Sequence, residues 1–132
     1  HLGAKKGALV ELTAPAGKGG APELAELAKE LLLQIVGFSP KYLDRSSVPA
    51  ADIEKEKEIY TELLRKEGKP EAQIPKIIEG KINKLFYQSL CLVDQLSVRD
   101  NKTSVSVIIK ETGTKLGGPV TVTRFARYQL GE

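Results

Sequence analysis

The sequence predicts an α+β fold, in which a small antiparallel sheet is covered by helices and an antiparallel helical hairpin projects from it. Two observations lead to this prediction. Stretches of strand type lie towards both ends of the chain, and helical stretches fill the middle. Helices that are separated from a small sheet are typical of this fold class. With 132 residues the chain has the length of one ordinary domain, so we expect residues 1–132 to be a single domain with the hairpin inserted at 49–88.

The first strand is predicted at residues 7–12, and a loop rich in Gly and Pro follows at 13–22. Pro22 suits the first turn of a helix, because the N–H that proline lacks would have no partner there. Gly37 is expected to end this helix, since glycine is favoured just beyond a helix C-terminus. Between them, apolar residues at helical spacing predict a core-packing face. These residues are Leu24, Leu27, Leu31 and Ile35.

The predicted hairpin begins with Pro49, another helix-start signal, and its first arm is dense in Glu and Lys to about residue 67. A Gly-Lys-Pro break at 68–70 separates the arms. Pro75 then marks an early position of the second arm, because deeper inside a helix it would cost roughly 3 kcal/mol. The first arm has a narrow apolar stripe, so we expect it to bury one seam against the second arm and to expose charge elsewhere.

Three further elements are expected after the hairpin. Residues 89–93 form a short apolar run of strand type. Residues 104–115 fit both strand alternation and helical spacing, so their periodicity leaves the choice open. Residues 120–128 alternate Val-Thr-Val-Thr and then become aromatic and basic, which makes them the clearest strand of the chain.

The sequence offers little material for catalysis or for metal binding. The single histidine is His1, and the single cysteine, Cys91, stands between two leucines, where a buried and unreactive thiol is expected. Nucleophilic catalysis needs an activated nucleophile, and a zinc site needs several converging ligands. We therefore expect no enzyme, no cofactor and no metal. One cysteine also favours a reducing compartment, and no apolar run approaches the ~18–20 residues that span a membrane.

Several segments, in this order along the chain, resemble the translation elongation factor Ts family. Their order and spacing make the resemblance specific, although each segment alone is short. The segments are residues 1–12, 39–43, 48–60, 68–81, 92–102 and 124–131. The resemblance implies that residues 104–115 are helical and that the chain is a core or dimerisation-type domain of this family. It also implies a role in protein biosynthesis, in which the chain binds elongation factor Tu as part of a guanine-nucleotide exchange factor.

The resemblance implies two sets of contact residues. Those expected to contact elongation factor Tu are His1, Arg124, Phe125 and Arg127. Those expected on the hairpin surface, where the family can associate with itself or with other proteins, are Ile59, Tyr60 and Leu63. The family also uses a Thr-Asp-Phe-Val segment near the magnesium site of Tu, but none of the three Phe residues in this chain follows an Asp. We therefore expect binding to Tu with little or no acceleration of GDP release.

The resemblance implies the bacterial cytoplasm, with a plastid or the mitochondrial matrix as the alternative. The absence of Met at His1 indicates a fragment or a processed chain. A second hypothesis, a ribosome- or RNA-associated module that reuses the fold, is motivated by the pI of about 9.0 and by the arginines of the last strand. Against it, acids alternate with lysines, as in Glu-Lys-Glu-Lys-Glu at 54–58, which indicates a solvated helix surface.

Overall fold

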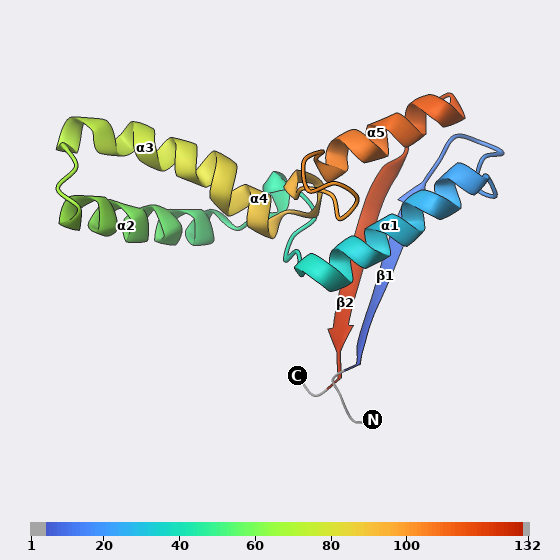
Figure 1. The fold of residues 1–132 in the computed structure, drawn as a ribbon, viewed down its shortest axis with the longest axis horizontal. Coiled ribbons are helices and arrows are strands. Elements are labelled where there is room, and N and C mark those ends of the chain that lie inside the picture. Colours follow the sequence, from blue (N-terminus) through green and yellow to red (C-terminus); the bar gives the residue numbers. More distant parts are fainter. Residues whose placement is uncertain (1–4, 131–132) are drawn as a thin grey trace.

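A computed structural model describes residues 5–130 and confirms the α+β class. The strands β1 (Lys6–Thr13) and β2 (Thr121–Gln129) lie antiparallel, so that the two ends of the described chain form one two-stranded sheet. Two helices, α1 (Pro22–Phe38) and α5 (Val105–Leu116), lie along this sheet (Figure 1). We call the sheet with α1 and α5 the body of the molecule.

The core of the body lies between the sheet and its two helices. α1 contributes the predicted face, which includes Leu31 and the fully buried Ile35. α5 adds Val105, Ile108 and Ile109, and the inward residues of the strands close the cluster. On β1 the core-facing residues alternate, as expected for a half-buried strand. They are Ala8, Val10 and Leu12.

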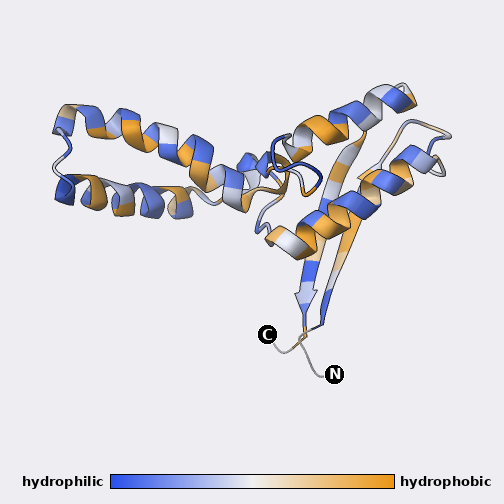
Figure 2. Cartoon of the chain, in the orientation of Figure 1, coloured by the Kyte–Doolittle hydropathy of each residue, from blue (hydrophilic) through white to orange (hydrophobic). Residues whose placement is uncertain are grey.

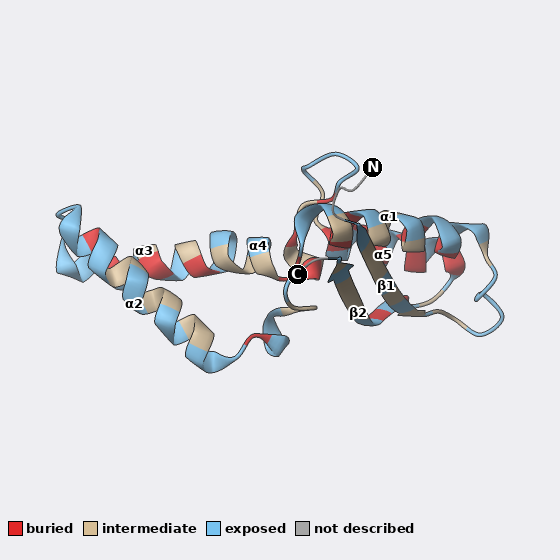
Figure 3. Ribbon diagram, turned by 90° about the horizontal axis from the view of Figure 1, so that it is seen from below, coloured by how far each residue is buried: buried red, intermediate tan, exposed pale blue. Residues whose placement is uncertain are grey.

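The hairpin projects from the body and has a small core of its own (Figures 1 and 3). Its arms are α2 (Ala50–Lys66) and a longer helix that begins with α3 (Ile74–Lys81), with Pro75 in the first turn as predicted. Only Leu64 is fully buried on α2, and Figure 2 shows how hydrophilic this helix is beside α1. The seam is a row of residues that face one another across the arms. They are Leu64, Ile74, Ile78 and Ile82.

The second arm runs to the body without a break, but its hydrogen bonding changes on the way. A π-helical turn, η3 (Ile82–Phe86), follows α3, and α4 (Tyr87–Leu90) completes the arm. Two 3-10 turns, Arg45–Ser47 and Leu92–Asp94, lie where the chain enters and leaves the hairpin, and a third, Glu71–Gln73, lies at its tip.

The predicted strand at residues 89–93 was wrong. Ser89 and Leu90 end the helical arm, Cys91 makes one isolated bridge to Tyr42, and Leu92 begins a 3-10 turn. The apolar run reflects burial rather than a strand, because Cys91 and Leu92 are completely inaccessible to solvent. Burial also raises the pKa of the Cys91 thiol to about 11, with the nearby carboxylates adding to the effect, so the expected unreactive thiol agrees with its surroundings.

Two helix boundaries show how caps and glycines act in this chain. Gly37 does not end α1 as predicted, because the helix continues through Phe38 and Ser39 takes the left-handed position with φ 49°. The helix at 104–115 is confirmed as α5. The Ser104 side chain accepts a hydrogen bond from the backbone N–H of Val107 at its start, and Gly117 ends it with φ 80°.

A buried pair of glutamines joins the body to the segment that follows the hairpin. Gln34 on α1 donates through Nε2 to Gln95 Oε1 at 3.1 Å and to the Leu96 carbonyl at 3.0 Å, and its own Oε1 accepts from the Val98 N–H at 2.8 Å. Gln95 in turn donates to the Ser89 carbonyl at 2.9 Å. These bonds satisfy both side-chain amides, as buried polar groups require.

Candidate partner-binding surfaces

The face of the sheet that points away from α1 and α5 is the first candidate surface. Leu9 is 63% exposed and Tyr128 is 58% exposed, although both side chains are large and mostly apolar. They lie on adjacent strands, since Leu9 pairs with Ala126 and Gly7 pairs with Tyr128. We call this side of the sheet the open face. Exposed apolar side chains that gather on one face are typical of contact surfaces.

A β-bulge shapes the end of the open face nearest the loop. Glu11 pairs with Arg124 and Leu12 pairs with Val122, so Thr123 is the extra residue on β2. The Thr123 hydroxyl donates to Glu11 Oε1 at 2.6 Å, and Arg124 Nε lies 3.2 Å from Glu11 Oε2. The Thr123 hydrogen bond, and after it the charge of Arg124, lower the pKa of the Glu11 carboxyl. The bulge therefore places an ion pair beside the apolar residues.

The structure does not gather all the residues predicted to contact Tu on one face. The Arg124 side chain is 79% exposed, whereas Phe125 packs against the core of the body. Arg127 is half-buried and donates from Nη2 to Gln129 Oε1 at 3.2 Å. Beyond the bulge the strand alternates, so Arg124 and Phe125 point to opposite sides. His1 lies outside the described residues.

Two residues of the open face were missed by sequence reasoning. Leu9 and Tyr128 line a shallow hollow of about 500 Å³, together with the Glu11–Arg124 pair. The signal that could have found Leu9 is strand alternation. Val10 points into the core, so both of its neighbours must point away from it. Tyr128 could be placed only with the strand register, because the bulge shifts the phase of β2.

The hairpin is the second candidate surface, and its three predicted residues also separate. Ile59 is 51% exposed and Leu63 is 46% exposed, one helical turn apart on the outside of α2. Tyr60 instead packs against the seam, with the Lys81 ammonium 5.6 Å from its ring centre. Of the three residues predicted for association, Ile59 and Leu63 are therefore the exposed ones.

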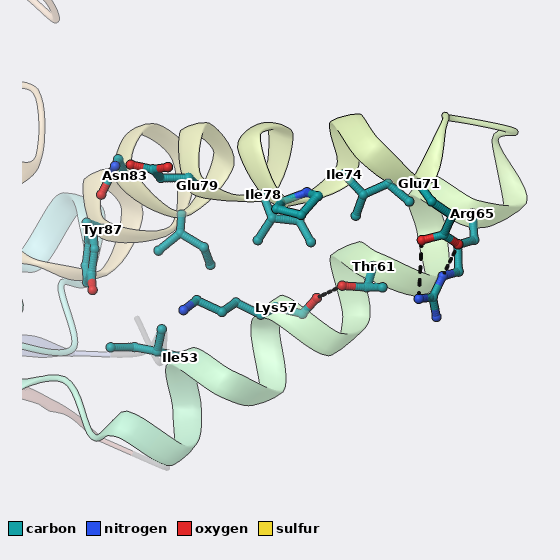
Figure 4. A pocket seen from close by; sticks show the side chains of 12 residues that line it. Ile53, Lys57, Thr61, Arg65, Glu71, Ile74, Ile78, Glu79, Asn83 and Tyr87 are labelled. Atoms are coloured by element: carbon teal, nitrogen blue, oxygen red, sulfur yellow. Dashed lines mark hydrogen bonds and ion pairs between the residues drawn. The ribbon is translucent and has the colours of Figure 1, made fainter.

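A crevice of about 620 Å³ runs between the two arms of the hairpin (Figure 4). Its apolar wall includes Ile74, Ile78 and Ile82 of the seam. Towards the body, Ile53 on α2 lies across from Tyr87 on the second arm. Near the tip an ion pair joins the arms, with Arg65 Nε 2.7 Å from Glu71 Oε1.

The described residues contain no group of His, Cys, Asp and Glu that could hold a metal ion. Among them no helix has the length and apolar character that crossing a membrane requires.

The sequence of the chain matches the family model of elongation factor TS over residues 1–132. The chain belongs to the elongation factor Ts family. Elongation factor Ts of Myxococcus xanthus is 46% identical over 111 residues, which cover 84% of this chain and 51% of that protein. Elongation factor Ts of Prosthecochloris aestuarii is 43% identical over 133 residues, covering 99% of this chain and 44% of its own length.

The family relationship is also clear among shorter members. Elongation factor Ts of Leptospira biflexa is 41% identical over 132 residues, which cover 99% of this chain and 66% of that protein. The chain spans about half the length of the first two relatives, at 51% and 44%. Membership of the family thus confirms the resemblance read from the sequence.

Proposed function

We propose that this chain binds elongation factor Tu as part of a guanine-nucleotide exchange factor, and that it does so in the bacterial cytoplasm. The observation that carries the proposal is the match to the elongation factor Ts family over residues 1–132. An exchange factor acts by preferring the nucleotide-free conformation of its partner, so that the nucleotide must then bind more weakly. This requires a contact surface and no catalytic group.

The open face supports this proposal as the contact surface. Leu9 and Tyr128 provide exposed apolar area, and the adjacent ion pair of Glu11 and Arg124 provides polar groups at its rim. Interfaces commonly combine an apolar centre, aromatic residues and arginine with a polar rim.

Binding to Tu is tested by titrating the chain against nucleotide-free Tu and against Tu·GDP. Leu9→Ser is expected to weaken binding about tenfold or more, because a central apolar contact is removed. Val107→Ser is the matched control, since Val107 is 43% exposed on α5, away from the open face. No binding of the wild-type chain to either form of Tu would overturn the proposal. If Leu9→Ser and Val107→Ser weaken binding to Tu equally, the open face is not the contact surface.

The same titration with labelled GDP tests the release step. We expect binding without faster GDP release, because none of the Phe residues of this chain follows an Asp. Release that is accelerated as strongly as by a full-length exchange factor would contradict this expectation.

Self-association is part of the proposal, because both candidate surfaces expose apolar residues. Sedimentation over a range of concentrations measures it. If copies pair through the open face, Leu9→Ser abolishes the dimer, whereas the pair Ile59→Ser and Leu63→Ser abolishes a dimer formed through the hairpin. A chain that stays monomeric at every concentration would exclude both arrangements.

The alternative of an RNA-associated module has weaker support. Arg124, the most exposed arginine of the last strand, is already paired with Glu11 at 3.2 Å. A phosphate-binding surface would instead gather unpaired basic residues, and its affinity would fall steeply with salt. RNA binding at low salt that disappears on raising the salt concentration, together with no binding to Tu, would favour this alternative.

A further inference from the structure

The base of the hairpin is fixed to the body where the chain enters and leaves. The N–H groups of Lys41 and Tyr42 both donate to the Leu90 carbonyl, at 2.8 and 3.0 Å, and the Leu92 N–H donates to the Tyr42 carbonyl at 2.8 Å. Leu92 packs in the core of the body and is completely buried. The end of the second arm is therefore fixed to the body by these hydrogen bonds and by the packing of Leu92.

The second arm changes its geometry just before this fixed end. In the π-helical turn η3 the Tyr87 N–H donates to the carbonyl of Ile82, five residues earlier. Such a turn makes the helix wider and interrupts its regular hydrogen bonds, and single π turns often occur at functional sites and at kinks. Its middle is open to water, since Leu85 is 53% exposed. The turn lies between the fixed base and the outer part of the seam. Its first residue, Ile82, is the innermost member of the seam, and Phe86 and Tyr87 pack against it.

Arg45 bridges this turn from the connector that precedes the hairpin. Its guanidinium carbon lies 4.6 Å from the centre of the Tyr87 ring, and Nη2 lies 3.4 Å from the Asn83 carbonyl oxygen inside the turn. Its Nε also lies 3.3 Å from Asp94 Oδ2, in the 3-10 turn beyond the arm. One side chain thus contacts the π turn, the end of the arm and the fixed segment.

The first arm has a matching contact. The Tyr42 hydroxyl donates to Asp52 Oδ2 at 2.8 Å, so a residue of the fixed base holds the first turn of α2. α2 has no side-chain hydrogen bond at its N-cap, Pro49, and Val48 links it to the connector. Arg45 and Tyr42 therefore each connect the segment before the hairpin to one arm, while the seam holds the two arms to each other.

We propose that the π turn η3 is a hinge about which the outer hairpin moves as a unit, and that Arg45 and Tyr42 are latches that hold one orientation. The Arg45 side chain is half exposed, and exposed ion pairs and cation–π contacts are individually weak. Losing the cation–π contact and ion pair of Arg45, or the hydrogen bond from Tyr42 to the Asp52 carboxylate, is expected to change the ratio of held to released orientations by about tenfold. Together the two latches set the direction in which the hairpin exposes Ile59 and Leu63.

The hinge is tested by measuring distances between spin labels on the hairpin and on the body. The labels are placed at Glu58→Cys on α2 and Lys110→Cys on α5, in a Cys91→Ala background, because both sites are exposed. Arg45→Ala and Tyr42→Phe are each expected to add a second distance population, with about a tenfold larger released fraction. Arg65→Ala is the matched control, since it removes an exposed ion pair of the hairpin that does not cross the hinge.

Removal of the exposed residue Lys84 tests the π turn itself. Deleting one residue from a π turn restores the α-helical pattern, so the second population should disappear even when Arg45→Ala is present. Circular dichroism of each variant checks that the helices are intact. If Arg45→Ala and Tyr42→Phe leave the distance distribution unchanged, or if Arg65→Ala broadens it equally, the latches are refuted. If the second population persists after removal of Lys84, the hinge is refuted.

Discussion

Asp100 shows how one side chain can order a turn. Its Oδ1 accepts from the N–H groups of Lys102 and Thr103, both at 2.9 Å, and its Oδ2 accepts from the Thr103 hydroxyl at 2.6 Å. These bonds favour the charged form, with the Thr103 hydroxyl contributing most, and lower the pKa of Asp100 to about 2. The turn leads directly into α5, so its order helps to position the start of that helix.

Asp100 should make the stability of the protein depend on pH at the acidic end. Its pKa is 3.8 when unperturbed and about 2 in the fold, so its contribution is present above about pH 4 and is lost as the pH falls towards 2. In Asp100→Asn the midpoint of thermal unfolding should fall less steeply over this range. Carbon NMR of the Asp100 carboxyl should give a midpoint near 2. A midpoint at the ordinary value would contradict the turn geometry.

Two helical glycines should respond in opposite ways to alanine. A Cβ on Gly113 would lie 2.8 Å from the Gly118 carbonyl oxygen, which is backbone and cannot easily move. Gly113→Ala should therefore lower the free energy of unfolding by about 1–3 kcal/mol. Gly80 in α3 has nothing within 4 Å of such a Cβ, so Gly80→Ala should raise it by about 0.4–1 kcal/mol. Urea unfolding of both variants checks this, and a loss at both positions would be contrary to it.

At the scale of elements, the hairpin and the body have separate hydrophobic clusters. Leu64 is 2% exposed in the seam, and its neighbour Leu63 is 46% exposed on the outside of α2. Leu64→Ala should cost about 2–5 kcal/mol, as large-to-small changes in a core do. Leu63→Ala should cost about 1 kcal/mol or less, because an exposed side chain loses little packing.

Hydrogen exchange locates the effect of Leu64→Ala. Amides of α2 and α3 should lose protection, while those of α1 and α5 keep theirs, because the body has its own core. Loss of protection throughout the chain would instead show that hairpin and body unfold as one cooperative unit.

Elements with strong local signals could be predicted from the sequence, and elements defined by tertiary contacts could not. Pro22 and Pro75 were assigned correctly to first helical turns, because proline restricts the backbone wherever it stands. The run at 89–93 was assigned wrongly, since deep burial and a strand give the same apolar pattern. The helix at 104–115 was ambiguous by periodicity and needed the family resemblance to be placed.

The candidate surfaces were predictable only in part for the same reason. Sequence alone identified the hairpin and the arginine strand, but side-chain direction depends on strand register and on the bulge at Thr123. Tyr60 looks equivalent to Ile59 in the sequence, yet only packing against the second arm turns it inwards.

At the scale of the whole molecule, the pair of Gln34 and Gln95 connects α1 with the segment that follows the hairpin. Gln34→Leu leaves the Val98 N–H and Gln95 Oε1 without their partner and should cost about 1–3 kcal/mol for each unsatisfied group. The change Gln95→Leu should be costly by the same argument, because Ser89 and Phe38 lose a donor.

A double-mutant cycle measures the coupling between the two glutamines. Since they share one network, the double variant should lose less stability than the sum of the single variants. Thermal and urea unfolding provide the values. Strict additivity would mean that the two amides contribute independently.

The two ends of the described chain meet at one end of the sheet, where the Leu130 N–H donates to the Lys5 carbonyl at 2.7 Å (Figure 1). A polypeptide can therefore enter and leave this fold at the same point. A short linker between these ends, with a new opening at Gly68 in the hairpin tip, would give a circular permutant without stretching any strand. Because the two ends lie close together, the domain could also be inserted into a loop of another protein.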